Sequence, residues 1–356
     1  APAYLLDVGT TTSGRIGVGG TQVVYKPDQT NFLGSLIYGD GGGKLTHSAG
    51  TEAYHNSIFG ILAGNSLTSA ADNTIFGWRA GRVNQTGNGV TAFGNQALEL
   101  NTAGANTAFG ANVLGGNTSG SNNTGIGVNS LGNNQTGSDN VGIGVNTLRL
   151  GNASYNMAIG TEALNTNKTG GQNVAIGYRG SYSNISATNT IAIGYQAARG
   201  ASSFNAQGYT AIGYQALTAI VTGANNNTAI GASAGATVSS GANNVLLGYQ
   251  AGDAITTGSN NIVIGYDIDA PSDTGSNQLT IGNLIFGTGL TATAKTVSTG
   301  KVGIGIAAPA TTLDVNGLVR AYQTSTTTCD ASVEGAFFYN GTAGNKHFYG
   351  CNGSTW

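Results

Sequence analysis

Asn-Thr-Ile-Phe-Gly at residues 73–77 decides the fold, because close variants of this stretch recur along most of the chain. It returns as Asn-Val-Ala-Ile-Gly at 173–177 and as Asn-Thr-Ala-Ile-Gly at 227–231. The closing glycine marks fourteen copies, from Gly60 to Gly282, and successive copies are about seventeen positions apart throughout. A regular period of this kind is the signature of a repeat protein in which each copy contacts only its neighbours.

Each copy has the pattern of a short strand, a bend and a polar loop. Asn stands four places before the glycine in ten of the fourteen copies, and Asn suits turns through its own amide and its tolerance of left-handed φ angles. Gly, Asn, Thr and β-branched residues dominate, which disfavours a helix and favours strands. We therefore expect an all-β, parallel solenoid in which one copy of the repeat, about seventeen residues long, forms one coil. At about 4.8 Å per layer, fourteen coils make a rod of roughly 65 Å.

The residue before the glycine is Phe, Ile or Leu in every copy. Because side chains alternate between the two faces of a strand, it shares a face with a Thr or Val, and a small Ala or Gly takes the other face. We expect the large residue inside the coil and a second chain close to the small one. Ile176→Asp should then unfold the rod locally. The fourteen positions are Phe59, Phe76, Phe93, Phe109, Ile126, Ile143, Ile159, Ile176, Ile193, Ile212, Ile230, Leu247, Ile264 and Ile281.

A coil this small encloses a thin core. Burying about 100 Å² of side chain per coil contributes roughly 2–3 kcal/mol. Ordering all the residues of a coil costs more than that, even at about 1 kcal/mol each. We therefore expect a homo-oligomer, with a trimer favoured over a dimer. The repeat glycine is expected to adopt a positive φ angle or to allow a close backbone approach.

The composition excludes several classes of protein. The 356 residues include 60 glycines and only 8 % charged residues, with a net charge of −2, so no basic surface for nucleic acid exists. Glycine does not recur at every third position, as collagen requires. The three histidines lack acidic partners at a useful spacing, which indicates a non-enzymatic protein without a cofactor. A calcium ladder is disfavoured because Asp is sparse, with Asp40, Asp267 and Asp269 the local candidates.

The repeat signature over about 56–282 resembles the head repeat of trimeric autotransporter adhesins. This resemblance implies left-handed parallel β-rolls bundled three-fold, and adhesion to surfaces. Residues 301–320, which begin Lys-Val-Gly-Ile-Gly, look like the neck segment of bacteriophage tail fibres and bacterial fibre proteins. The stretch bracketed by Cys329 and Cys351 is similar to a small module of the same fibre proteins.

These observations divide the chain into four parts. Residues 1–55 form an N-terminal cap or attachment region, 56–282 the β-roll rod, 283–322 a neck, and 323–356 a small terminal β-module. An even, local pair of cysteines predicts a disulfide in an exported protein, with two unpaired thiols as the alternative.

Two groups of aromatic residues are candidate contact surfaces. The residue after the repeat glycine is aromatic in six coils, and stacked coils would place these rings in a row that a glycan could bind. Packing against a neighbouring chain or against each other is the alternative use of these rings. The row consists of Trp78, Tyr178, Tyr195, Tyr214, Tyr249 and Tyr266. In the terminal module, the candidate tip contacts, or alternatively core residues, are Phe338, Tyr349 and Trp356.

The function predicted from these features is an extracellular or cell-surface adhesin. It would be a rigid homotrimeric stalk that attaches to a receptor or glycan on a host or prey cell. A phage tail fibre on the virion is one alternative. A filament subunit with end-to-end contacts through 1–55 or 323–356 is another. An ice-binding solenoid is disfavoured because Phe, Ile or Leu replaces the second Thr of a Thr-x-Thr row.

Overall fold

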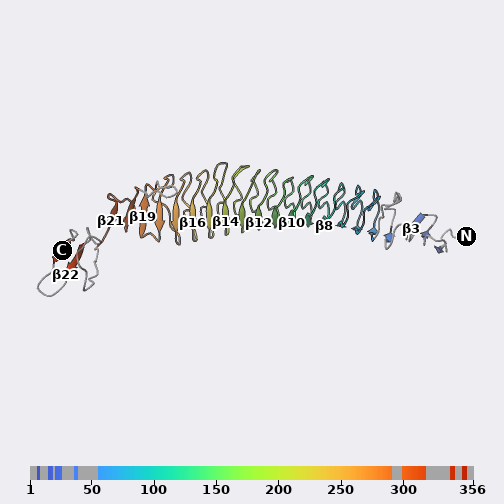
Figure 1. Cartoon of the computed structure of the whole chain (residues 1–356), viewed down its shortest axis with the longest axis horizontal. Helices are drawn as coiled ribbons and strands as arrows, with labels where there is room; N and C mark the ends of the chain where they lie inside the picture. Colours follow the sequence, from blue (N-terminus) through green and yellow to red (C-terminus); the bar gives the residue numbers. More distant parts are fainter. Residues whose placement is uncertain are drawn as a thin grey trace.

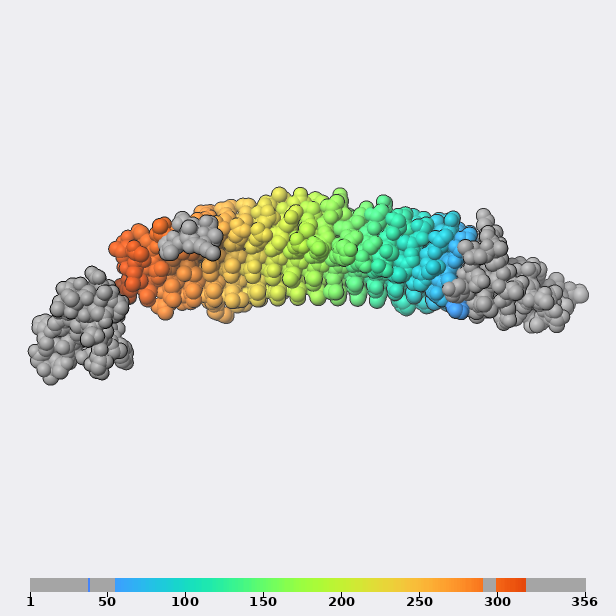
Figure 2. All heavy atoms as spheres, in the orientation of Figure 1, coloured from blue at the N-terminus to red at the C-terminus, as the bar shows by residue number. Residues whose placement is uncertain are grey.

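The computed structural model describes residues 55–290 and 299–317, Tyr38, and the backbone of six strands outside these ranges. Its described part contains strands and turns and no helix, so no helix there could cross a membrane. The coils stack into an elongated, gently curved rod (Figure 1). Their packing is continuous along the visible surface of the rod (Figure 2).

Fourteen three-residue strands, one in each copy of the repeat, form the rod. Each pairs in parallel with the next at equivalent positions, for example Ala175 with Ala192 and Ile176 with Ile193. The fold is thus a parallel β-solenoid in which one repeat makes one coil, as expected. The strands are β5 (Ser57–Phe59), β6 (Thr74–Phe76), β7 (Thr91–Phe93), β8 (Thr107–Phe109), β9 (Thr124–Ile126), β10 (Val141–Ile143), β11 (Met157–Ile159), β12 (Val174–Ile176), β13 (Ile191–Ile193), β14 (Thr210–Ile212), β15 (Thr228–Ile230), β16 (Val245–Leu247), β17 (Ile262–Ile264) and β18 (Leu279–Ile281).

The sheet extends beyond the repeats at both ends. At the N-terminal end, β1 (Leu6–Val8), β2 (Arg15–Val18), β3 (Thr21–Tyr25) and β4 (Leu36–Tyr38) pair antiparallel in sequence, and β4 then pairs in parallel with β5. At the other end, β19 (Ile285–Thr288) and β20 (Lys301–Ile304) add antiparallel, and β21 (Leu313–Val315) adds in parallel. A separate antiparallel pair consists of β22 (Phe337–Asn340) and β23 (His347–Gly350).

The two faces of each strand are the reverse of the expectation from sequence. In β12 the small residue Ala175 is fully buried inside the coil, whereas Val174 and Ile176 are only half-buried on the outside. Phe59 and Phe109 in the same outer position are 42 % and 52 % exposed. The prediction that the large residue fills the coil was wrong, because the interior is filled from another part of the coil.

That other part is the turn, which supplies the large buried side chain four residues after the repeat glycine. Where the middle of the strand is Ala or Gly, this turn residue is most often a fully buried Leu. Where the strand itself supplies Ile75 or Leu246, the turn residue is Gly81 or Gly252. A Cβ at Gly81 would lie 3.0 Å from Cδ1 of Ile75. The turn leucines are Leu98, Leu114, Leu131, Leu148, Leu164 and Leu217.

The coil between Gly194 and Gly213 is the longest of the repeats and fills its interior differently. Phe204 and Tyr209 are the largest fully buried side chains of the described residues. They lie beside turns in which a smaller residue, such as Ser181, stands in place of Leu. The Tyr209 hydroxyl is 2.5 Å from Oγ of Ser181, and its burial raises the pKa of Tyr209. The extra residues of this coil thus replace the missing aliphatic volume with aromatic rings.

The repeat glycine serves both purposes expected of it. Its φ angle lies between +121° and +148° in the thirteen copies from Gly60 to Gly265, a region that only glycine occupies at low cost. A Cβ at Gly94 would also lie 2.3 Å from the carbonyl oxygen of Gly110 in the next coil. Any other residue would therefore strain its own backbone and push the coils apart.

The asparagine four places before the glycine forms buried ladders along the rod, which are interrupted at Val90, Thr190 and Tyr209. The backbone N–H and the side-chain amide of Asn140 both donate to Oδ1 of Asn123 at 3.1 Å. The Asn140 amide also donates to the carbonyl oxygen of Ala153 at 2.8 Å. The left-handed conformation falls one residue earlier, at Asp139, whose φ angle is +57°. Asparagine is thus used here to satisfy buried backbone groups between coils.

Candidate functional site

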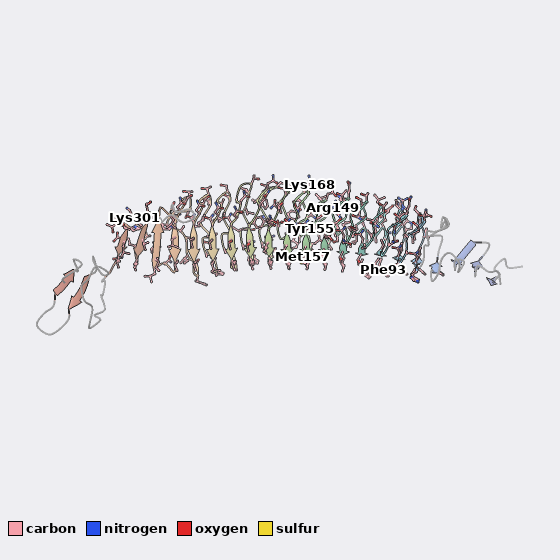
Figure 3. All side chains as sticks on the ribbon, viewed as in Figure 1. Phe93, Arg149, Tyr155, Met157, Lys168 and Lys301 are labelled. Carbon is pink, nitrogen blue, oxygen red and sulfur yellow. The ribbon has the colours of Figure 1, made fainter. Side chains whose placement is uncertain are left out.

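The outer face of the strands forms a continuous apolar column along the rod. The column comprises the residue before each repeat glycine, from Phe59 to Ile281, and we refer to it as the outer column. Phe93 and Met157 lie on the edge of the rod built by the strands, and Lys168 lies on the opposite edge, built by loops (Figure 3). Strand alternation also places the Thr or Val two residues earlier on this face. A continuous apolar surface of this length is typical of an interaction site.

Aromatic rings make up the N-terminal part of the outer column. Phe59, Phe76, Phe93 and Phe109 stack in series, and Tyr38 of β4 extends the stack beyond the column, with ring centroids 4.6–4.7 Å apart and planes within 8° of parallel. From Ile126 onward the column is aliphatic. The strand register therefore places like residues on like residues in successive layers.

A second column, the tyrosine row, runs beside the first at the residue after the repeat glycine. The structure brings three of the predicted members together, since Tyr178, Tyr195 and Tyr214 stack at 5.3 and 5.4 Å. Tyr249 and Tyr266 form a second stack at 5.1 Å. These distances confirm that the tyrosines lie in a row, in two stacks.

Trp78 occupies the same column far from the tyrosines. The next coil carries Asn95 at the equivalent position, and the guanidinium of Arg79 lies 5.0 Å from the centroid of the Trp78 ring. Trp78 is thus an isolated ring paired with a cation rather than a member of the stacks.

The stacking limits what the tyrosine row can bind. Both faces of Tyr195 are covered, by Tyr178 on one side and by Tyr214 on the other. The Arg179 guanidinium lies 5.0 Å from the centroid of Tyr178. A sugar that packs on a ring face can therefore reach only the tyrosines at the ends of the stacks.

Polar side chains line the tyrosine row on one side. The Gln215 amide donates to Oε1 of Gln196 at 3.2 Å, and the Gln250 amide donates to Oδ2 of Asp253 at 3.2 Å. Burial and the nearby Asp269 raise the pKa of Asp253. The row thus combines aromatic rings with amides that can donate and accept hydrogen bonds.

The buried charges near Trp78 are paired with each other. Glu99 accepts hydrogen bonds from Gln96 at 2.7 Å and from Nε of Arg82 at 3.0 Å, and Nη2 of Arg79 lies 3.1 Å from it. Further along, Glu162 accepts a 2.5 Å hydrogen bond from Arg179, which raises the pKa of that guanidinium. These groups cross-link neighbouring coils.

Several candidate residues are not described in full. Phe338 in β22 lies opposite Tyr349 in β23 in the backbone register, and nothing further is described of their side chains. Trp356 and the cysteines Cys329 and Cys351 lie outside the described residues, as does Asp40. Over 55–290 and 299–317, no group of three His, Cys, Asp or Glu residues is placed to hold a metal ion.

Sequence reasoning missed two features of the rod. It did not foresee the buried pair Phe204 and Tyr209, although the length of their coil was visible. It also placed all six aromatic residues in one row, although Ala232 separates the tyrosines into two stacks. No protein-family model, curated protein or solved structure matches this chain significantly.

Proposed function

We propose that this chain forms the rigid stalk of an extracellular homotrimeric fibre that attaches to a receptor or glycan on a cell surface. The observation that carries the proposal is the outer column, which leaves large apolar side chains in water along the whole repeat region. Phe109, Ile230 and Leu247 are all more than a third exposed in the single chain. Burying such a column against sister chains removes it from water.

The geometry of the rod favours a side-by-side bundle. The outer column keeps the same register from coil to coil, because the last residue of each strand pairs with the last residue of the previous strand. Identical chains in parallel can therefore contact one another along their full length. The resemblance of residues 56–282 to trimeric adhesin heads favours three chains around a shared axis.

An adhesive function fits the remaining chemistry. In the described part of the chain the charged groups near Trp78 and Tyr178 are engaged in ion pairs. The side of the rod next to the outer column presents stacked rings and amides, which are groups that recognise carbohydrate.

The native mass in solution tests this proposal. Light scattering on the purified protein should give about three times the single-chain mass of 35.5 kDa. A mass of 35.5 kDa would contradict the oligomer and leave the outer column in water.

Attachment needs its own measurement. Beads coated with the protein should retain cells, and enzymatic removal of surface glycans or proteins from the cells should reduce retention. Beads that retain no more cells than albumin-coated beads would contradict the adhesive part of the proposal.

A further inference from the structure

The tyrosine row is interrupted at a single coil between its two stacks. Ala232 occupies that layer, with Tyr214 in the layer before and Tyr249 in the layer after. The register is continuous there, because Ser233 N–H donates to Tyr214 O at 2.7 Å and Gln250 N–H donates to Ala232 O at 2.9 Å. In this column the two rings are thus two layers apart, and the residue at the equivalent position between them is an alanine.

The spacing of this gap selects the shape of its occupant. Stacked tyrosines in adjacent layers have centroids 5.1–5.4 Å apart, so two layers place these two rings roughly 10–11 Å apart. A flat ring in contact with both tyrosines at about 3.5–4.0 Å needs only about 7–8 Å. The gap is therefore too wide for a flat ring and suits a thicker, puckered one with C–H groups on both faces. Such hydrogens carry a partial positive charge, which is attracted to the negative face of a tyrosine ring.

The groups beside the gap point to a neutral, hydroxylated ligand. Gln215, Ser233 and Gln250 directly follow the three residues that frame the gap, and all three are partly accessible. Amides and a hydroxyl can donate to and accept from sugar hydroxyl groups. The Gln250 amide donates a 3.2 Å hydrogen bond to the carboxylate of Asp253. These layers present no Lys or Arg to bind an acidic sugar.

We infer that the gap over Ala232 binds one neutral pyranose ring, sandwiched between Tyr214 and Tyr249. The inference rests on the proposed function, since the sugar would be a unit of the glycan to which the fibre attaches. It also accounts for the interruption of the row, because a tyrosine at residue 232 would occupy the place of the sugar.

The variant Ala232→Tyr tests this inference by filling the gap with a residue that the same column accepts in five other coils. Ala111→Tyr is the matched control, since Ala111 lies in the same column between Asn95 and Val128, where no tyrosine flanks it. The probes are an array of oligosaccharides ending in neutral hexoses or N-acetylhexosamines, and titration with the best of them. Ala232→Tyr should weaken binding at least tenfold, and Ala111→Tyr should leave it unchanged.

Each other outcome overturns the inference. Equal binding by Ala232→Tyr and the parent protein would place any sugar site elsewhere. Binding of no neutral glycan, or of acidic glycans alone, would exclude a neutral pyranose from the gap. If Ala232→Tyr abolished attachment to cells that had been stripped of glycans, the gap would bind a protein side chain instead. The trimeric mass and bead attachment of the parent protein report separately on the proposed fibre.

Discussion

At the residue scale, the repeat glycine is the position that tolerates substitution least. Two independent constraints act on it, namely its φ angle and the carbonyl oxygen of the next coil. Leu and Gln occupy other left-handed positions in the turns, for example Leu98 with φ +52° and Gln96 with φ +57°. The glycine is different because its φ angle is above +120° in the thirteen copies from Gly60 to Gly265, where a side chain strains the backbone.

We expect Gly177→Ala to lower the free energy of unfolding by about 2–4 kcal/mol, since strain and a clash act together. The added Cβ would lie 2.4 Å from the carbonyl oxygen of Gly194, at a φ angle of +126°. Denaturant unfolding followed by circular dichroism measures the loss. Gly89→Asn is the control, because a Cβ there meets nothing within 4 Å and Asn122 holds the same left-handed position in another coil. Equal losses in both variants would contradict the role given to close coil contact.

At the scale of the element, the middle of the strand and the turn position four residues after the glycine share one space, and a large aliphatic side chain comes from only one of the two. The strand supplies it as Ile75 opposite Gly81, and the turn supplies it as Leu98 opposite Ala92. Some coils bury a further aliphatic residue, such as Ile220 or Ile255. Because the interior is closely packed, the two positions cannot both be large or both be small without cost.

Moving the large side chain from the turn to the strand within one coil, by substitutions at Leu98 and Ala92, tests this packing. Leu98→Gly should cost about 2–4 kcal/mol by leaving a cavity. Ala92→Ile should cost about 1–3 kcal/mol by overpacking. The double variant recreates the pattern of the neighbouring Ile75 coil, so its loss should be smaller than the sum by at least about 1 kcal/mol. Denaturant unfolding of all four proteins gives the coupling, and strict additivity would refute the shared-volume explanation.

At the scale of the whole molecule, the inner and outer faces of the strands have different tasks. The inner face closes the coil, and the outer column carries the apolar side chains that the proposed oligomer would bury. A charge on each face should therefore have a different effect, and β12 offers neighbouring positions for the comparison.

We expect Ala175→Asp to unfold the rod locally, because it places a carboxylate in the dry interior. Ile176→Asp should leave the fold of the single chain intact and convert the oligomer to a smaller particle. Circular dichroism and light scattering on both variants separate these effects. The assignment of faces is wrong if Ile176→Asp melts the coil and Ala175→Asp does not.

Much of the fold could be predicted from the repeat itself. The repeat period, the strand positions and the need for glycine follow from recurring residues such as Gly94 and Phe93, since similar copies stack in the same register. The tyrosine row was predictable for the same reason. The division of the row into two stacks could be predicted from Ala232. Its consequence for ligand binding could not, because it depends on neighbouring rings covering each other's faces, which the structure shows.

That Ala175 and Ile176 lie on opposite faces follows from their order along the strand, because side chains alternate between its two faces. Which of the two faces is the interior depends on how the coil closes in space. The reason is volume: a turn leucine such as Leu164 fills the narrow coil, so the strand can contribute no more than a small residue there. The alternation of side chains along the strand does not specify which residue of the turn, several positions away, fills the interior of the coil.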